Sequence, residues 1–200
     1  MSIVKLNDRA VSNATTFGSI SSLGEMVFIS KATASSSASI EFTLGDYKEY
    51  QFYFVDIHPQ TSGVQFQFNM STDSGANYNV IKTSTSFIAY HAEAGNDSTL
   101  SYSTGTDLAQ STSEQSLLGG DSLGGDADQI FVGKLQIFNP SSTIYVKHYI
   151  SRNNFSGNSD YNVNSFQAGY GNTTSAINSV RFKMSSGNID AGEILLFGIN

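Results

Sequence analysis

Short segments in which hydrophobic and polar residues alternate one by one recur along this chain of 200 residues. The clearest segment covers residues 64–70, in which valine, phenylalanine and methionine alternate with glutamine and asparagine. Successive side chains of a β-strand point to opposite faces, so this pattern predicts a strand with one buried face. Long helices draw on alanine, glutamate, lysine, leucine and arginine, and that mixture is missing. The chain is therefore predicted to be all-β.

About ten short strands, separated by turn residues, favour an antiparallel β-sandwich of jelly-roll type. No repeat period is visible, which argues against a propeller or a solenoid. The segment 101–128 is rich in glycine, serine and aspartate and is expected to form long loops. We expect strands at residues 40–44, 48–58, 64–70, 87–91, 115–118, 130–138, 143–151, 165–171, 180–184 and 193–199. In the strand 143–151, Ile144, Val146 and Ile150 are predicted to share one face.

The chain divides into a short arm and one domain. Residues 1–24 are weakly patterned and are expected to be a frayed terminus, a short edge strand, or an anchor that docks on another subunit. Residues 25–200 are expected to form a single β-sandwich domain, since such folds often reach about 200–250 residues. Because a chain of this size can bury a proper core and has no cysteine, neither a disulfide nor a metal is required for folding.

The segment 48–58 is hydrophobic on both of its predicted faces. A strand of this kind is usually central in a sheet or covered by a partner. We therefore expect a subunit interface there. One face is predicted to carry Tyr50, Phe52 and Phe54, and the other Tyr53, Val55 and Ile57.

The charge of the chain argues against two classes of partner. Its formal net charge is −7, and its ten lysines and arginines are scattered. Nucleic-acid binding normally needs clustered basic charge, as does binding to an anionic membrane surface, so neither is expected. The first residues do not resemble a cleavable signal, and no run of about 18 apolar residues predicts a membrane span.

Residues 71–78, with the sequence Ser-Thr-Asp-Ser-Gly-Ala-Asn-Tyr, resemble the Asp-box motif with tyrosine in place of tryptophan. The aspartate of such a motif accepts backbone N–H groups across a hairpin turn, and glycine permits positive φ. Because only one copy occurs, we interpret it as a stabilised β-turn.

The glycine-rich stretch from Asp121 to Asp128 is a hypothetical calcium site, since carboxylate oxygens are the ligands that calcium prefers. Its spacing does not match an EF-hand, and we prefer a solvated loop. The three histidines, His58, His91 and His148, have no second ligand at helical or strand spacing, so no metal is expected.

No catalytic residue or cofactor is predicted. The chain has neither a nucleophile elbow nor a phosphate-binding glycine loop. Tyrosines at strand ends or in loops suit ordinary sheet packing, interfaces or stacking on sugars. These are Tyr90, Tyr102, Tyr145, Tyr149, Tyr161 and Tyr170.

Several segments together resemble a group of virion-associated proteins of marine tailed bacteriophages. They are residues 47–50 and 57–59, 138–143 and 145–148, and 173–177, 184–192 and 196–199. The resemblance covers roughly residues 25–200 and carries no catalytic residues. It implies a structural protein of the virion, assembled in the host cytoplasm: capsid decoration, fibre or another tail part.

Three functions are compared. The first is a non-enzymatic structural component of a bacteriophage particle, self-associating, expected to be a trimer in contact with other virion proteins. The second is a module that binds a host receptor or surface glycan, which needs an exposed groove with coplanar aromatic rings. The third, which we disfavour, is a glycan-degrading enzyme with two carboxylates roughly 5–10 Å apart in a cleft.

Overall fold

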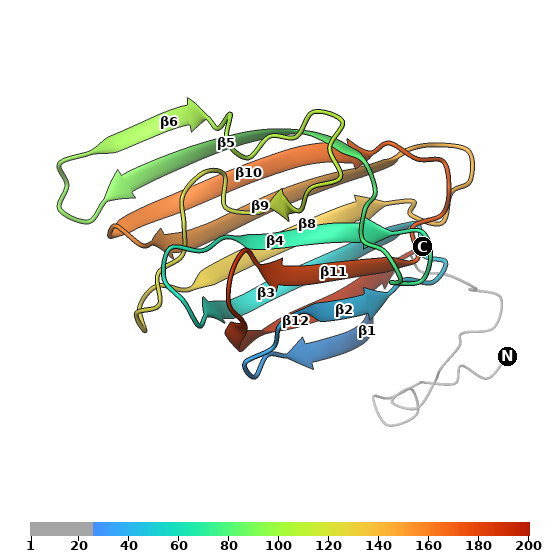
Figure 1. Cartoon of the computed structure of the whole chain (residues 1–200), viewed down its shortest axis with the longest axis horizontal. Coiled ribbons are helices and arrows are strands. Elements are labelled where there is room, and N and C mark those ends of the chain that lie inside the picture. Colours follow the sequence, from blue (N-terminus) through green and yellow to red (C-terminus); the bar gives the residue numbers. More distant parts are fainter. Residues whose placement is uncertain (1–25) are drawn as a thin grey trace, which may run out of the picture.

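The computed structural model describes residues 26–200, and every regular element in that range is a β-strand (Figure 1). The predicted arm, residues 1–24, lies outside the described residues. The strands are β1 (Met26–Thr33), β2 (Ile40–Thr43), β3 (Glu49–Pro59), β4 (Phe66–Ser71), β5 (Lys82–Ala92), β6 (Ser98–Tyr102), β7 (Gln115–Ser116), β8 (Phe131–Phe138), β9 (Lys147–Gly157), β10 (Tyr161–Gly171), β11 (Ser179–Met184) and β12 (Ile189–Ile199).

These strands form two antiparallel sheets of unequal size. The large sheet has eight strands in the order β1-β12-β3-β8-β9-β10-β5-β6, and the small sheet has four in the order β2-β11-β4-β7. The prediction of an all-β antiparallel sandwich is confirmed, with twelve strands in place of about ten. The jelly-roll connectivity stays a prediction.

Phenylalanine rings join the two sheets. The small sheet lies over the part of the large sheet that contains β3 and β12 (Figure 1). The Phe182 ring on β11 lies 5.1 Å from that of Phe52 and 5.3 Å from that of Phe54, both on β3, between ring centroids. Each such edge-to-face pair adds about 0.5–1.5 kcal/mol beyond the burial of its surface. The core is therefore centred between β3 and β11.

Beyond the small sheet, the segment 103–130 covers the inner face of β9, β10 and β5 (Figure 1). This part of the interior is polar. Buried Asn153 and Ser165 both donate hydrogen bonds to the Leu117 carbonyl oxygen, at 3.0 and 2.8 Å. Since inward-facing polar residues interrupt the hydrophobic alternation, the sequence predicted β5 and β10 too short. It also missed the two edge strands, β1 and β6, neither of which has a buried residue to produce an alternating pattern. The expected long loop and the brief strand near residue 115 are confirmed.

A β-bulge in β3 corrects the predicted face of Ile57. Asp56 has a φ of 50°, and the pairing with β8 shifts between Phe54 and Ile57. The extra residue reverses the alternation. Ile57 is therefore fully buried on the core face with Phe54, whereas Val55 stays 41% exposed on the other face.

The prediction for residues 143–151 was wrong in its boundaries and in its buried face. The strand is β9, from Lys147 to Gly157, and the hydrophobic Ile144 and Ile150 are 70% and 49% exposed. Lys147 and Ser151 are buried instead. The Lys147 ammonium donates to two backbone carbonyl oxygens, which allows a lysine to occupy the inner face.

Candidate functional site

The Asp-box-like segment forms the expected turn after β4. The Asp73 carboxylate accepts hydrogen bonds from the Ser71 hydroxyl at 2.7 Å and from the Asn77 backbone N–H at 2.8 Å. These bonds, together with one from the Asn77 side chain, lower the pKa of Asp73 to about 2. Ser74 and Gly75 both have positive φ. The interpretation of this motif as a stabilised turn is confirmed.

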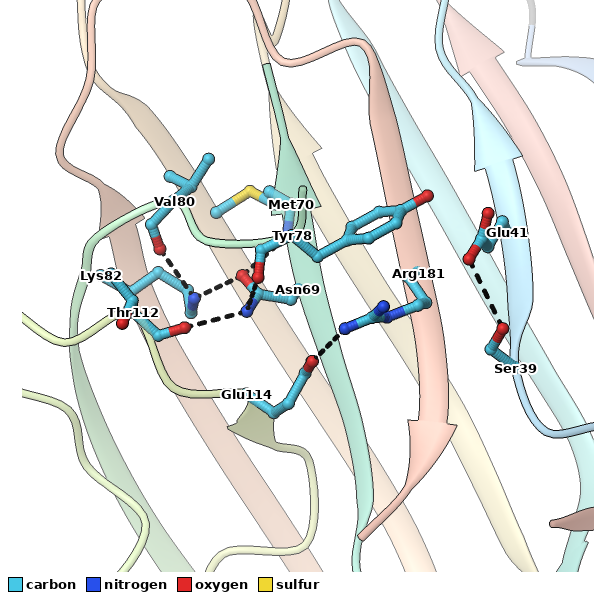
Figure 2. Close-up of polar contacts among 10 residues, drawn as sticks. All are labelled: Ser39, Glu41, Asn69, Met70, Tyr78, Val80, Lys82, Thr112, Glu114 and Arg181. Carbon is cyan, nitrogen blue, oxygen red and sulfur yellow. Dashed lines mark hydrogen bonds and ion pairs between the residues drawn. The ribbon is translucent and has the colours of Figure 1, made fainter. Parts of the chain in front are cut away.

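Lys82, next to this turn, is a titratable group with a strongly shifted pKa (Figure 2). Its ammonium donates to the Asn69 side-chain oxygen at 2.6 Å and to the Val80 carbonyl oxygen at 2.9 Å. Burial lowers the pKa of Lys82 to about 8. Such shifts often mark catalytic groups. Here the side chain is 0% exposed, so no substrate can reach it, and its role is structural.

Arg181 completes this buried cluster on β11 (Figure 2). Its guanidinium donates to the Glu114 carboxylate at 2.5 Å and lies 4.3 Å above the centre of the Tyr78 ring. The second Glu114 oxygen and the Arg181 Nε are buried without a hydrogen-bond partner. The cluster therefore ties the turn and the segment 103–130 to the small sheet.

The structure does not assemble the predicted metal candidates. Within residues 26–200 no group of three or more His, Cys, Asp or Glu side chains is placed to share an ion. Asp121 instead lines a 230 Å³ pocket with Tyr90 and Tyr161, where burial raises the pKa of its carboxyl. Asp121 is the one carboxylate that lines this pocket. Elsewhere, His58 lies beside Asp190, with 3.8 Å between its Nδ1 and a carboxylate oxygen.

The tyrosines highlighted by the sequence are dispersed. Tyr149 is buried and donates to Gln115, whereas Tyr145 is 69% exposed. The rings of Tyr90 and Tyr161 meet edge to face at 4.9 Å between centroids. Tyr145, Tyr149 and the Tyr90–Tyr161 pair therefore do not form one flat aromatic surface on which a sugar could stack.

The edge strand β1 exposes four consecutive hydrophobic residues. Met26 and Phe28 are 47% and 55% exposed, and Val27 and Ile29 are 40% and 37% exposed. Among residues 26–200, β1 is paired along one edge, with β12. The Phe28 ring meets that of Phe197 on β12 at 5.5 Å. A hydrophobic patch therefore surrounds an unpaired strand edge.

The face of the large sheet that points away from the small sheet, hereafter the outer face, carries one continuous row of side chains. The strand registers place one residue of each of six neighbouring strands side by side. Four members are aromatic and two are basic, and all are exposed or half-buried. From β6 to β3 the row is Tyr102, Phe87, Phe166, Arg152, Lys134 and Tyr53.

Sequence reasoning had pointed to Tyr102 and Tyr53 but missed the middle of this row. The Phe87 and Phe166 rings are stacked, with centroids 4.7 Å apart and an interplanar angle of 9°. The Arg152 guanidinium lies 5.3 Å from the centre of the Phe166 ring. These residues come from β5, β10 and β9, and no local pattern indicates that they are neighbours.

Two open depressions flank the row. The first has a volume of about 360 Å³, and its polar lining consists of Lys134, Arg152, Asn154 and Asn164. Val132, Gly133 and Asn153 complete its wall. The second, of about 510 Å³, is lined mainly by Ile150, Ala168, Tyr170 and neighbouring residues of β5 and β9. The row therefore separates a basic, amide-rich depression from a largely apolar one.

Comparison of the chain with models of protein families, with curated proteins and with solved structures gives no match. In the part of the chain that the structure describes, no helix has the length and apolar character needed to cross a bilayer.

Proposed function

We propose that this protein is a non-enzymatic structural component of a bacteriophage particle and that it self-associates through the β1 edge of its large sheet. The observation that carries the proposal is the run Met26–Ile29, four consecutive exposed hydrophobic residues on an edge strand. Further support comes from the sequence resemblance to virion-associated phage proteins. The sequence predicts a trimer that contacts other virion proteins. A trimer requires a heterologous contact, in which the β1 edge of one copy meets a different surface of the next copy.

An exposed edge strand favours pairing with another chain, because its N–H and C=O groups are unpaired. Hydrophobic side chains on both faces of β1 strengthen this tendency, since a partner strand brings its own side chains onto both faces. The opposite edge strand, β6, is a five-residue strand in which large hydrophobic residues are not consecutive. We therefore place the subunit contact at β1 and not at residues 48–58, where the sequence led us to expect it. Those residues form β3, a central strand paired on both edges, with Phe52 and Phe54 buried in the core.

The oligomeric state of the full chain tests this proposal. Size-exclusion chromatography with light scattering should give an oligomer for the wild type and a monomer for Phe28→Glu, because the charge would be buried in the contact. Leu100→Glu, at the opposite edge, is the matched control and should leave the oligomer intact. A wild type that is monomeric at all concentrations contradicts the proposal, as does an unchanged Phe28→Glu oligomer with native circular dichroism.

The place of the protein on a particle is a separate question. Antibody labelling of purified phage particles, followed by electron microscopy, should reveal regularly repeated copies on the capsid or the tail. Particles without the protein would contradict the virion role while leaving the subunit contact to the first experiment.

A further inference from the structure

Lys134 and Arg152 are directly opposite each other in the pairing of β8 with β9, and both point to the outer face. Like charges in this position destabilise a sheet. Within residues 26–200 neither cation forms an ion pair with a carboxylate. The arrangement is therefore unfavourable for folding and leaves two cations available in a chain whose formal net charge is −7.

Two acidic residues of the large sheet, Glu49 and Glu193, form hydrogen bonds with other side chains. Glu49 accepts hydrogen bonds from two neighbouring glutamine side chains, and Glu193 accepts from Lys31 and Thr33. Neither Glu49 nor Glu193 forms an ion pair with Lys134 or Arg152. An anionic group from outside would relieve their repulsion.

The surroundings hold the guanidinium in a defined place. The Phe166 ring, itself stacked on Phe87, lies beside Arg152 and restricts its side chain. An arginine held by an aromatic ring keeps its N–H groups free for a planar oxyanion such as a carboxylate. The depression of about 360 Å³ next to it leaves room for such a group.

Amide side chains line the same depression. Asn154 donates both of its described hydrogen bonds through Nδ2, to Asn162 and to the Val163 carbonyl oxygen, so its Oδ1 can still accept. The Asn164 side chain makes no hydrogen bond to residues 26–200 and has both donors and an acceptor to offer. Neutral amide groups of this kind can form hydrogen bonds with the hydroxyl groups of a ligand.

From this combination we propose that the outer face binds an acidic polysaccharide, with Lys134 and Arg152 contacting its carboxylate or sulfate groups. Asn154 and Asn164 contact neighbouring hydroxyls. The depression is open, which suits a long polymer better than a small molecule in an enclosed pocket. The apolar depression beyond the row, lined by Ile150 and Ala168, receives the C–H surface of an adjoining sugar ring. Two cations are too few for a polynucleotide.

This site is independent of the proposed subunit contact. Strands β12 and β3 separate β1 from β8, so a copy paired at β1 leaves the row on β8, β9 and β10 accessible. The Phe28→Glu monomer should therefore bind a short acidic oligosaccharide with unchanged affinity. Loss of binding in that monomer would contradict the separation of the two surfaces.

Calorimetric titration of the full chain tests the site with four probes: dextran sulfate, polygalacturonate, neutral dextran and polyglutamate. Binding to at least one acidic polysaccharide is expected, stronger at low salt and absent for neutral dextran. Arg152→Gln and Lys134→Gln should each raise the dissociation constant about tenfold, because each removes a charge-assisted hydrogen bond. Two variants on different strands keep the test valid if one fails to fold.

Lys183→Gln is the matched control, since it removes the same charge from the small sheet. Its dissociation constant should stay within about twofold of the wild type. The site is overturned if neither acidic polysaccharide binds, if Lys183→Gln weakens binding as much as Arg152→Gln, or if neutral dextran binds equally well. Equal binding of polyglutamate would assign the surface to an acidic peptide and would also contradict the proposal.

Discussion

Lys82 illustrates how a single buried charge influences the stability of this protein. Its side chain lies under the turn that follows β4 and has no exposed surface, and its ammonium has two oxygen partners. Two hydrogen bonds do not fully replace hydration, and burial lowers the pKa of Lys82 from 10.5 to about 8. Protonated Lys82 is therefore less stable in the folded protein than in the unfolded chain.

Between pH 8 and 10.5 the unfolded chain keeps the Lys82 proton that the folded protein has lost. The contribution of Lys82 to the free energy of unfolding therefore rises with pH, by about 2 kcal/mol between pH 7 and 9.5. Urea denaturation of wild type and Lys82→Met should show this rise in the wild type alone. Lys183→Met, with a less buried lysine, should follow the wild type. Parallel pH profiles for wild type and Lys82→Met would contradict the buried charge.

Polar side chains of β9 and β10 hold the segment 103–130 against the large sheet. Asn153 is buried and donates to the Leu117 carbonyl oxygen, and it also contacts Ser151 and Gln167. Because backbone carbonyls of an irregular segment need partners when buried, polar side chains on the inner face hold this segment in place. A hydrophobic inner face would leave those carbonyl groups unsatisfied.

Asn153→Leu should lower the free energy of unfolding by about 2–3 kcal/mol, since it removes these hydrogen bonds and leaves buried polar groups without a partner. Urea denaturation measures this loss, and limited proteolysis should cut the segment 103–130 faster in the variant. Asn162→Ala, at an exposed position on β10, should change stability by less than about 0.5 kcal/mol. Similar losses in both variants would rule out the specific role of Asn153.

The small sheet and the segment 103–130 cover the inner face of the eight-stranded sheet and leave its outer face and its β1 edge open. The uncovered side chains differ in chemical character from one part of the sheet to another. At β1 the uncovered residues are hydrophobic, which favours contact with another copy. At β8, β9 and β10 they are basic, amide and aromatic, which favours an acidic polymer. The proposed contact between copies and the proposed binding surface thus lie on different strands of the large sheet.

The proposed self-association would make the thermal stability of the protein depend on its concentration. For a trimer, tenfold dilution should lower the free energy of unfolding by about 1 kcal per mole of chain. This loss corresponds to a decrease in Tm of about 2–4 °C. Differential scanning calorimetry should detect this shift in the wild type, whereas the Tm of Phe28→Glu should not depend on concentration. A constant wild-type Tm would contradict an assembly at β1.

Local pattern was sufficient for much of the fold. Strands β2, β4 and β11 follow from period-two alternation, and the turn at Asp73 follows from the residues that make its hydrogen bonds. Both features depend on neighbours in the chain, so they can be predicted from it. The exclusion of cysteine chemistry likewise needed only the sequence.

Long-range pairing decided the rest. Nothing near Lys134 indicates that Arg152 lies opposite it, because register is selected among many competing pairings of strands distant in sequence. The bulge at Asp56 and the polar inner face of β9 have the same origin: each is stable only because another segment packs against it. The candidate binding surface therefore exists in the sheet and in no single strand, which is why the sequence alone did not indicate it.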